Sequence, residues 1–159
     1  MSKKILTKEI AEELVRNTSE MRLNANQFTE LTTECALALS KFLGDVLELN
    51  SIEQLPQEVA KSIAEFSGSF LCLNGLKEIS DEAIKELGNF RGEHLQLQGL
   101  LRANKKVIET LCLINQRQEH THYRVTLRLP NLNPANELTD IIIKYDWDRV
   151  EIGSWVHQS

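Results

Sequence analysis

A pattern of 24 residues repeats along this chain and constrains its fold more than any other feature. Residues 31–54, 55–78 and 79–102 align without a gap, and the same residue types recur at fixed places. Each copy has an aliphatic residue at its start, then a glutamate, a phenylalanine and a glycine, and it closes on a Leu-x-Leu segment followed by an amide. The aligned residues are Leu31, Leu55 and Ile79; Glu34, Glu58 and Glu82; Phe42, Phe66 and Phe90; and Gly44, Gly68 and Gly92. Such self-similarity is typical of repeat architectures.

Less regular copies flank these three. Residues 6–30 form a looser first copy, which closes on Met21-x-Leu23-Asn24. A fifth, irregular copy spans residues 103–132 and has about eight residues more than the period requires. Residues 133–159 form the last unit, in which Trp147 and Trp155 are expected to cover the open end of the core. The chain is therefore expected to be a single repeat domain over residues 1–159.

Each copy predicts a helix followed by a short strand. In residues 55–78 the apolar residues are spaced three and four apart, which places them on one helical face. These residues are Val59, Ala60, Ile63 and Phe66. Pro56 marks the helix start, as Thr32 and Ser80 do in the sister copies. The recurring glycine is expected at the helix end in the left-handed conformation, which glycine adopts without steric cost.

A helix-plus-strand unit of this size cannot bury its apolar face alone, so neighbouring units must pack against one another around one core. The expected fold class is α/β. We expect a short solenoid of about five to six units, with parallel strands on one face and helices on the other. In Leu71-Cys72-Leu73, both leucines then point to the core and Cys72 points outward.

The segments LELNSIEQL and LCLNGLKEI resemble the leucine-rich repeat family, in a variant form typical of bacterial proteins. The resemblance covers residues 6–102 well and reaches the C-terminus weakly. In the family an asparagine follows the first strand leucine by five residues, whereas Asn50 follows Leu47 by three. We therefore expect the amide row to bond turn backbone between units rather than to form the family's usual asparagine ladder. This row consists of Asn24, Asn50, Asn74 and Gln98.

Composition narrows the partners. With 18 basic and 23 acidic side chains, the formal net charge is -5, which repels nucleic acid and anionic membranes. No apolar run approaches the roughly 20 residues that span a bilayer, and the N-terminal segment lacks the apolar stretch of a secretory signal. The three cysteines follow neither a disulfide nor a zinc pattern. A cytoplasmic protein without nucleic-acid or membrane partners is expected.

Candidate catalytic groups are few. The sequence has no nucleophile elbow, no glycine-rich phosphate loop and no metalloprotease motif. His120 and His122 are placed to share a metal, but histidines in a polar insertion are more often solvated. Cys72 beside His94 resembles a thiol with its base, yet no third group orients the histidine. We therefore expect no enzymatic activity, no cofactor and no metal.

The outward face of the strands carries the most functional promise. Extrapolating the strand alternation predicts a first row of Glu20, Val46, Phe70, His94, Thr126 and Arg149. The second predicted row is Arg22, Glu48, Cys72, Gln96, Arg128 and Glu151. Val46, Phe70 and Cys72 make an apolar centre with charges toward both ends, a composition typical of a protein interface. The alternative is that the C-terminal segment folds over this face and buries it.

The sequence thus predicts a non-enzymatic module that binds a partner protein through its strand face. An inhibitor or immunity protein that neutralises a basic toxin or enzyme is a narrower form of this prediction, because acidic charge speeds encounter with a basic partner. A structural or self-assembling subunit is the main alternative, and a metal-dependent enzyme is the weakest. The partner's identity and the choice between monomer and homodimer stay open.

Overall fold

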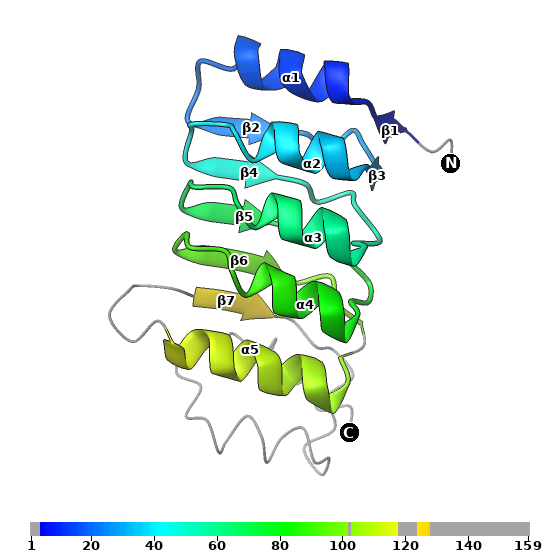
Figure 1. Ribbon diagram of the computed structural model, residues 1–159, viewed down its shortest axis with the longest axis vertical. Coiled ribbons are helices and arrows are strands. Elements are labelled where there is room, and N and C mark those ends of the chain that lie inside the picture. The colour runs from blue at the N-terminus through cyan, green and yellow to red at the C-terminus, as the bar shows by residue number, and fades with distance from the viewer. Residues whose placement is uncertain (1–3, 102, 118–123, 128–159) are drawn as a thin grey trace, which may run out of the picture.

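The computed structural model describes residues 4–101, 103–117 and 124–127. These residues form a mixed α/β fold in which five helices lie on one side of a parallel sheet (Figure 1). The helices are α1 (Lys8–Asn17), α2 (Thr33–Leu39), α3 (Gln57–Ile63), α4 (Asp81–Leu87) and α5 (Lys105–Arg117). Among the described residues, no helix has both the length and the apolarity that crossing a membrane requires.

The main sheet has five strands that pair in chain order. They are β2 (Arg22–Asn24), β4 (Val46–Glu48), β5 (Phe70–Cys72), β6 (His94–Leu97) and β7 (Arg124–Leu127), and every pair is parallel. A second sheet, which the periodicity does not predict, pairs β1 (Ile5–Leu6) with β3 (Glu30–Leu31) in parallel. The α/β class expected from the sequence is confirmed, because each parallel pair is joined through a helix.

The period of 24 residues is also the register of the central strands. Val46 pairs with Phe70, and Phe70 pairs with His94. The helix starts lie where the sequence predicts them: the hydroxyl oxygens of Thr32 and Ser80 accept hydrogen bonds from backbone N–H groups in the first turn, and Pro56 occupies the same place before α3. Each of these first turns also holds a glutamate, where the helix dipole favours negative charge.

The recurring glycines do not end helices, contrary to the sequence-based expectation. Helices α2, α3 and α4 reach their C-caps at Ser40, Ala64 and Gly88, before the glycines occur. Gly44, Gly68 and Gly92 do not have left-handed φ angles. A Cβ atom on Gly68 would instead lie 2.6 Å from the carbonyl oxygen of Gly44 and 2.7 Å from that of Asp45. These glycines are needed because the backbones of successive units approach closely there.

The first unit differs from the prediction in the register of its strand. Leu23, not Met21, pairs with Leu47. Ala25 is fully buried at the place that Leu49 occupies in the next unit. The small apolar side chain of Ala25 hid this alignment, and α1, with 10 residues where α2 has 7, brings the chain to its strand later.

The fifth unit is also longer by a different amount than expected. Leu95 pairs with Val125 and Leu97 with Leu127, an offset of 30 residues, which exceeds the period of 24 by six. The prediction of about eight extra residues is therefore wrong. The longer helix accounts for the difference, because α5 has 13 residues and α4 has 7. Val107, Ile108 and Leu111 of α5 are buried, as the repeat predicts.

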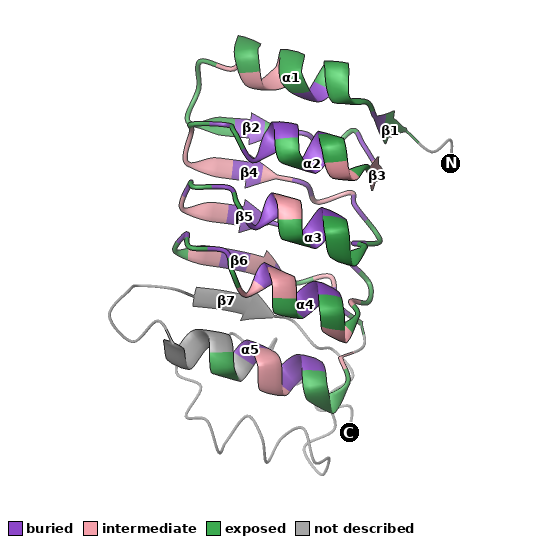
Figure 2. Ribbon diagram, in the orientation of Figure 1, coloured by how far each residue is buried: buried purple, intermediate pink, exposed green. Residues whose placement is uncertain are grey.

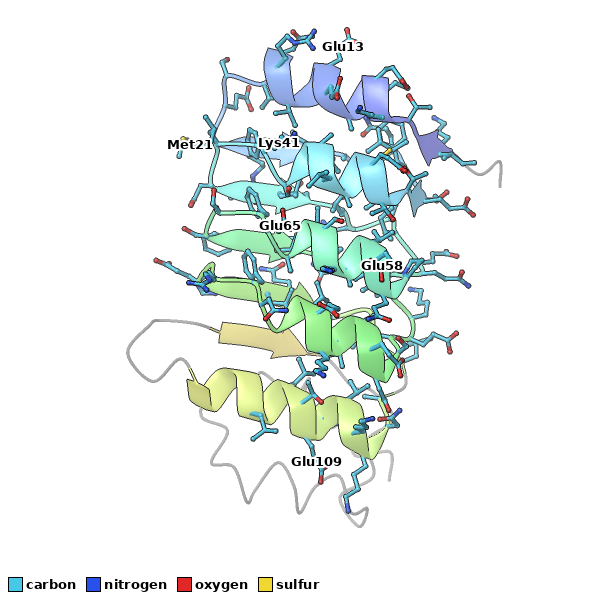
Figure 3. The ribbon with its side chains drawn as sticks, viewed as in Figure 1. Glu13, Met21, Lys41, Glu58, Glu65 and Glu109 are labelled. Atoms are coloured by element: carbon cyan, nitrogen blue, oxygen red, sulfur yellow. The ribbon has the colours of Figure 1, made fainter. Side chains whose placement is uncertain are left out.

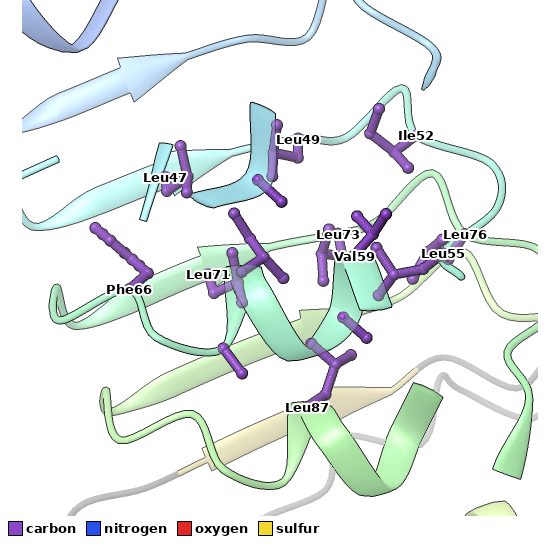
Figure 4. Packing of buried hydrophobic residues seen from close by; sticks show 14 of the residues in the cluster. Leu47, Leu49, Ile52, Leu55, Val59, Phe66, Leu71, Leu73, Leu76 and Leu87 are labelled. Atoms are coloured by element: carbon purple, nitrogen blue, oxygen red, sulfur yellow. The ribbon is translucent and has the colours of Figure 1, made fainter. Parts of the chain in front are cut away.

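A single core runs between the helices and the sheet. Its buried side chains line the inner sides of both layers (Figure 2), and Figure 4 shows the leucine rows of β4 and β5 within it. Phe66 is buried but follows the end of α3 instead of lying on its face, which corrects the predicted helical position. Its ring stacks between those of Phe42 and Phe90, with centroids 6.3 Å apart on each side.

Asparagine side chains connect the units at the ends of the strands. The Oδ1 atoms of Asn26, Asn50 and Asn74 each accept a hydrogen bond from the backbone N–H of the residue 24 positions later, at 2.6, 3.1 and 3.0 Å. The predicted bonding of turn backbone between units is confirmed for Asn50 and Asn74. In the first unit Asn26, not Asn24, has this role, and Asn24 accepts a local bond from the N–H of Asn26.

We predict that Gly68→Ala lowers the free energy of unfolding by about 2–3 kcal/mol, because overpacking against backbone cannot be relieved by a side-chain rotation. The matched control is Gly88→Ala, since Gly88 has φ -62° and ψ -11°, a conformation that alanine adopts readily. This control is expected to be neutral or to stabilise by about 0.5–1 kcal/mol. Urea denaturation of both variants measures the difference, and equal effects would contradict the close-approach explanation.

We further predict that Asn50→Ala costs about 1–3 kcal/mol, because the half-buried N–H of Asn74 loses its acceptor. Asn24→Ala is the matched control, since it removes an acceptor at an exposed turn, where water replaces the bond. Thermal unfolding followed by circular dichroism compares the two variants. A control as destabilised as Asn50→Ala would show that the bonds between units have no special weight.

Candidate functional site

The candidate site is the outer side of the main sheet, opposite the helices. We call it the strand face and define it by the outward residues of β2, β4, β5 and β6. They form a first row of Arg22, Val46, Phe70 and His94 and a second row of Asn24, Glu48, Cys72 and Gln96. Of the sequence-predicted site residues, Val46, Phe70 and His94 thus share one row, and Glu48, Cys72 and Gln96 share the other.

The ends of the predicted rows were wrong. Arg22, not Glu20, pairs with Val46 in the first row, because the strand of the first unit is shifted by two residues. At the other end Arg124 pairs with His94, and Thr126 moves to the second row beside Gln96. The sequence-based prediction missed Arg124, whose place follows from aligning Leu127 with Leu97.

Several predicted residues lie outside the described part of the chain. These are Arg128, Arg149 and Glu151 of the strand face, the insertion histidines His120 and His122, and the capping residues Trp147 and Trp155. The described residues contain no group of three or more histidine, cysteine, aspartate or glutamate side chains placed to hold a metal ion.

An aromatic pair forms the centre of the first row. The rings of Phe70 and His94 are nearly parallel, with an interplanar angle of 9° and centroids 4.3 Å apart. Both side chains are half-buried, as is Val46 on the adjacent strand. A valine and a phenylalanine that stay partly exposed beside an aromatic partner offer the compact apolar area on which protein interfaces usually depend.

An ion pair lies at one end of this apolar centre. Nη1 of Arg22 lies 2.9 Å from Oε1 of Glu48, and Nδ2 of Asn26 lies 3.4 Å from Oε2. The Arg22 side chain is 62% exposed, whereas that of Glu48 is 15% exposed. The pair therefore presents its guanidinium outward and keeps its carboxylate against the sheet, with both carboxylate oxygens occupied.

Cys72 does not have the surroundings of an activated thiol. It is only 5% exposed, and burial together with the nearby Glu48 carboxylate raises the pKa of its thiol from 9.0 to about 11. The predicted base, His94, stands in the other row and stacks on Phe70, while Gln96 is the residue in register with Cys72. Because a nucleophilic cysteine needs a depressed pKa, this geometry does not favour thiol catalysis.

We predict that Cys72 alkylates slowly at pH 8 and that its rate of reaction with iodoacetamide keeps rising toward pH 11, because only the thiolate reacts. Glu48→Gln removes a negative charge that disfavours the thiolate, so its rate profile is expected to move to lower pH. Mass spectrometry of the peptide that contains Cys72 gives the rates, with the exposed Glu78→Gln as control. Identical profiles for both variants would contradict the proposed influence of Glu48.

The same shift affects stability at high pH. Since the folded-state pKa of Cys72 is raised, the contribution of the neutral thiol is complete below pH 9 and is lost as the pH rises toward 11. Cys35, the other buried thiol, has a different environment, in which Sγ donates a hydrogen bond to the carbonyl oxygen of Leu6 at 2.8 Å.

The chain was compared with protein-family models, with curated proteins and with solved structures. No family model, no curated protein and no solved structure matches it. The fold and the strand face described above are therefore argued from the residues of this chain.

Proposed function

We propose that this protein is a non-enzymatic binding module that holds a partner protein on its strand face. The observation that carries the proposal is the half-exposed row of Val46, Phe70 and His94, beside the outward-facing Arg22. An aromatic anchor surrounded by polar and charged groups is the usual composition of an interface centre. Rigid backbone below the row supports the same view, because parallel strands hold the side chains in fixed register.

The finer description of the fold belongs to the same proposal. We propose that the units form a short solenoid similar to leucine-rich repeat proteins, whose exposed strand surfaces are suited to binding. The repeated register of 24 residues and the contacts between successive helices support this interpretation. Within the proposal, an inhibitor or immunity protein is the narrower form, and a self-assembling subunit is the alternative.

We predict that Phe70→Asp abolishes partner capture. The test is affinity capture from native extract with the wild-type chain, with Phe70→Asp and with Leu37→Asp, followed by mass spectrometry. Leu37 is the matched control, because it is an exposed apolar residue of α2 on the opposite side. A protein held by wild type and by Leu37→Asp, but at least about tenfold depleted with Phe70→Asp, would support the proposal.

Equal capture by wild type and by Phe70→Asp would place the interface elsewhere and contradict the proposal. Sedimentation of the purified chain over a range of concentrations distinguishes the alternative. A concentration-dependent increase in size that Phe70→Asp removes would assign the strand face to self-association instead.

A further inference from the structure

The repeat provides an internal control for which surface residues the fold requires. Leu43 is 92% exposed, and the equivalent residues of the next two units are Ser67 and Arg91. Met21 is 67% exposed, and its partner position in the next unit is Asp45. Units of the same fold thus place polar residues where these two units expose large apolar ones. Packing within the described residues gives no reason for either side chain to be apolar.

These two residues lie together at the edge where the chain enters the strands. The carbonyl oxygen of Met21 accepts hydrogen bonds from the N–H groups of Asp45 and Val46, at 2.6 and 2.9 Å, and Leu43 precedes this segment by two residues. Figure 3 shows the Met21 side chain at the outer edge of the molecule, directed away from the core. We call Met21 and Leu43 the entry corner. It adjoins Val46 and so extends the apolar part of the strand face.

The charges around the entry corner are not balanced toward the partner. The acids in the neighbouring strands are bonded within the protein: Asp45 Oδ1 accepts from the N–H of Ser69 at 3.2 Å, and both oxygens of Glu48 are occupied. The guanidinium of Arg22 is largely exposed and uses only one nitrogen in its bond to Glu48. The remaining exposed acid, Glu20, precedes Met21 and would repel a carboxylate on its own side.

From this arrangement we infer that the strand face takes a linear segment of a partner protein with an apolar side chain next to a carboxylate. The apolar side chain contacts the entry corner and Val46, and the carboxylate pairs with Arg22, where a guanidinium offers several donors in one plane. The inference rests on the proposed function and specifies the partner's chemistry. It also predicts that the contacting segment is acidic, although the net charge of -5 favours encounter with basic proteins.

The test uses peptides, because no partner has to be known beforehand. A library of random twelve-residue peptides displayed on phage is selected against the full chain, and enriched peptides are synthesised and measured by fluorescence polarisation. We expect an aspartate or glutamate close to an apolar residue in the enriched sequences. Their affinity is expected to fall at least about tenfold with Arg22→Glu and with Leu43→Ser.

Two further variants serve as controls. Arg16→Glu makes the same charge reversal on the exposed side of α1 and is expected to leave affinity unchanged. Glu20→Gln is expected to strengthen binding, because it removes the acid that opposes the partner's carboxylate. Circular dichroism melting curves establish that each variant is folded.

The outcomes separate this inference from the proposed function. Enriched peptides that are basic, or that bind Arg22→Glu as well as wild type, would overturn the acidic-segment inference, and a loss with Phe70→Asp would still support the strand face. Selection without any enriched peptide would also overturn it. Sedimentation with anionic phospholipid vesicles that depends on Leu43 would assign the entry corner to a lipid surface instead.

Discussion

Close approach of backbone between successive units is the constraint on which the rest of the structure depends. At Gly68 the main chain lies so near the carbonyl groups of Gly44 and Asp45 that no side chain fits between them. The same segments are joined by hydrogen bonds from Asp45 to the N–H of Ser69 and from Asn50 to the N–H of Asn74. Contact before the strand and bonding after it leave a single register for each pair of units, since a slip of one residue would break both.

That register has a direct consequence for the strand face. Because the inner positions are occupied by leucines and the turns by glycine and asparagine, the outward positions of each strand are free of structural duty. They vary widely between units, from valine to phenylalanine to histidine in the first row. Side chains with so little in common are nevertheless held in fixed places, and a rigid arrangement of diverse groups is what selective binding requires.

The extent to which the sequence predicts the structure follows from how strongly each position is constrained. The helix starts at Thr32 and Ser80 and the central register were predictable, because capping and alternation each depend on few residue types. The role of Gly68 was not, since positive φ and steric closeness both select glycine and only coordinates distinguish them. Pairing of β1 with β3 was missed because two-residue strands have no periodicity to detect.

Errors in the candidate site have the same origin. The central residues Phe70 and His94 lie where alternation places them, but each end of the row depended on a unit with a longer helix. A longer helix changes the residue at which the strand begins, and an error of two residues retains the inward and outward pattern while it replaces the residue in the row. Hydrophobic alternation alone therefore cannot reveal such an error. Arg22 entered the first row through this shift, which is why the exposed guanidinium and the apolar centre lie side by side.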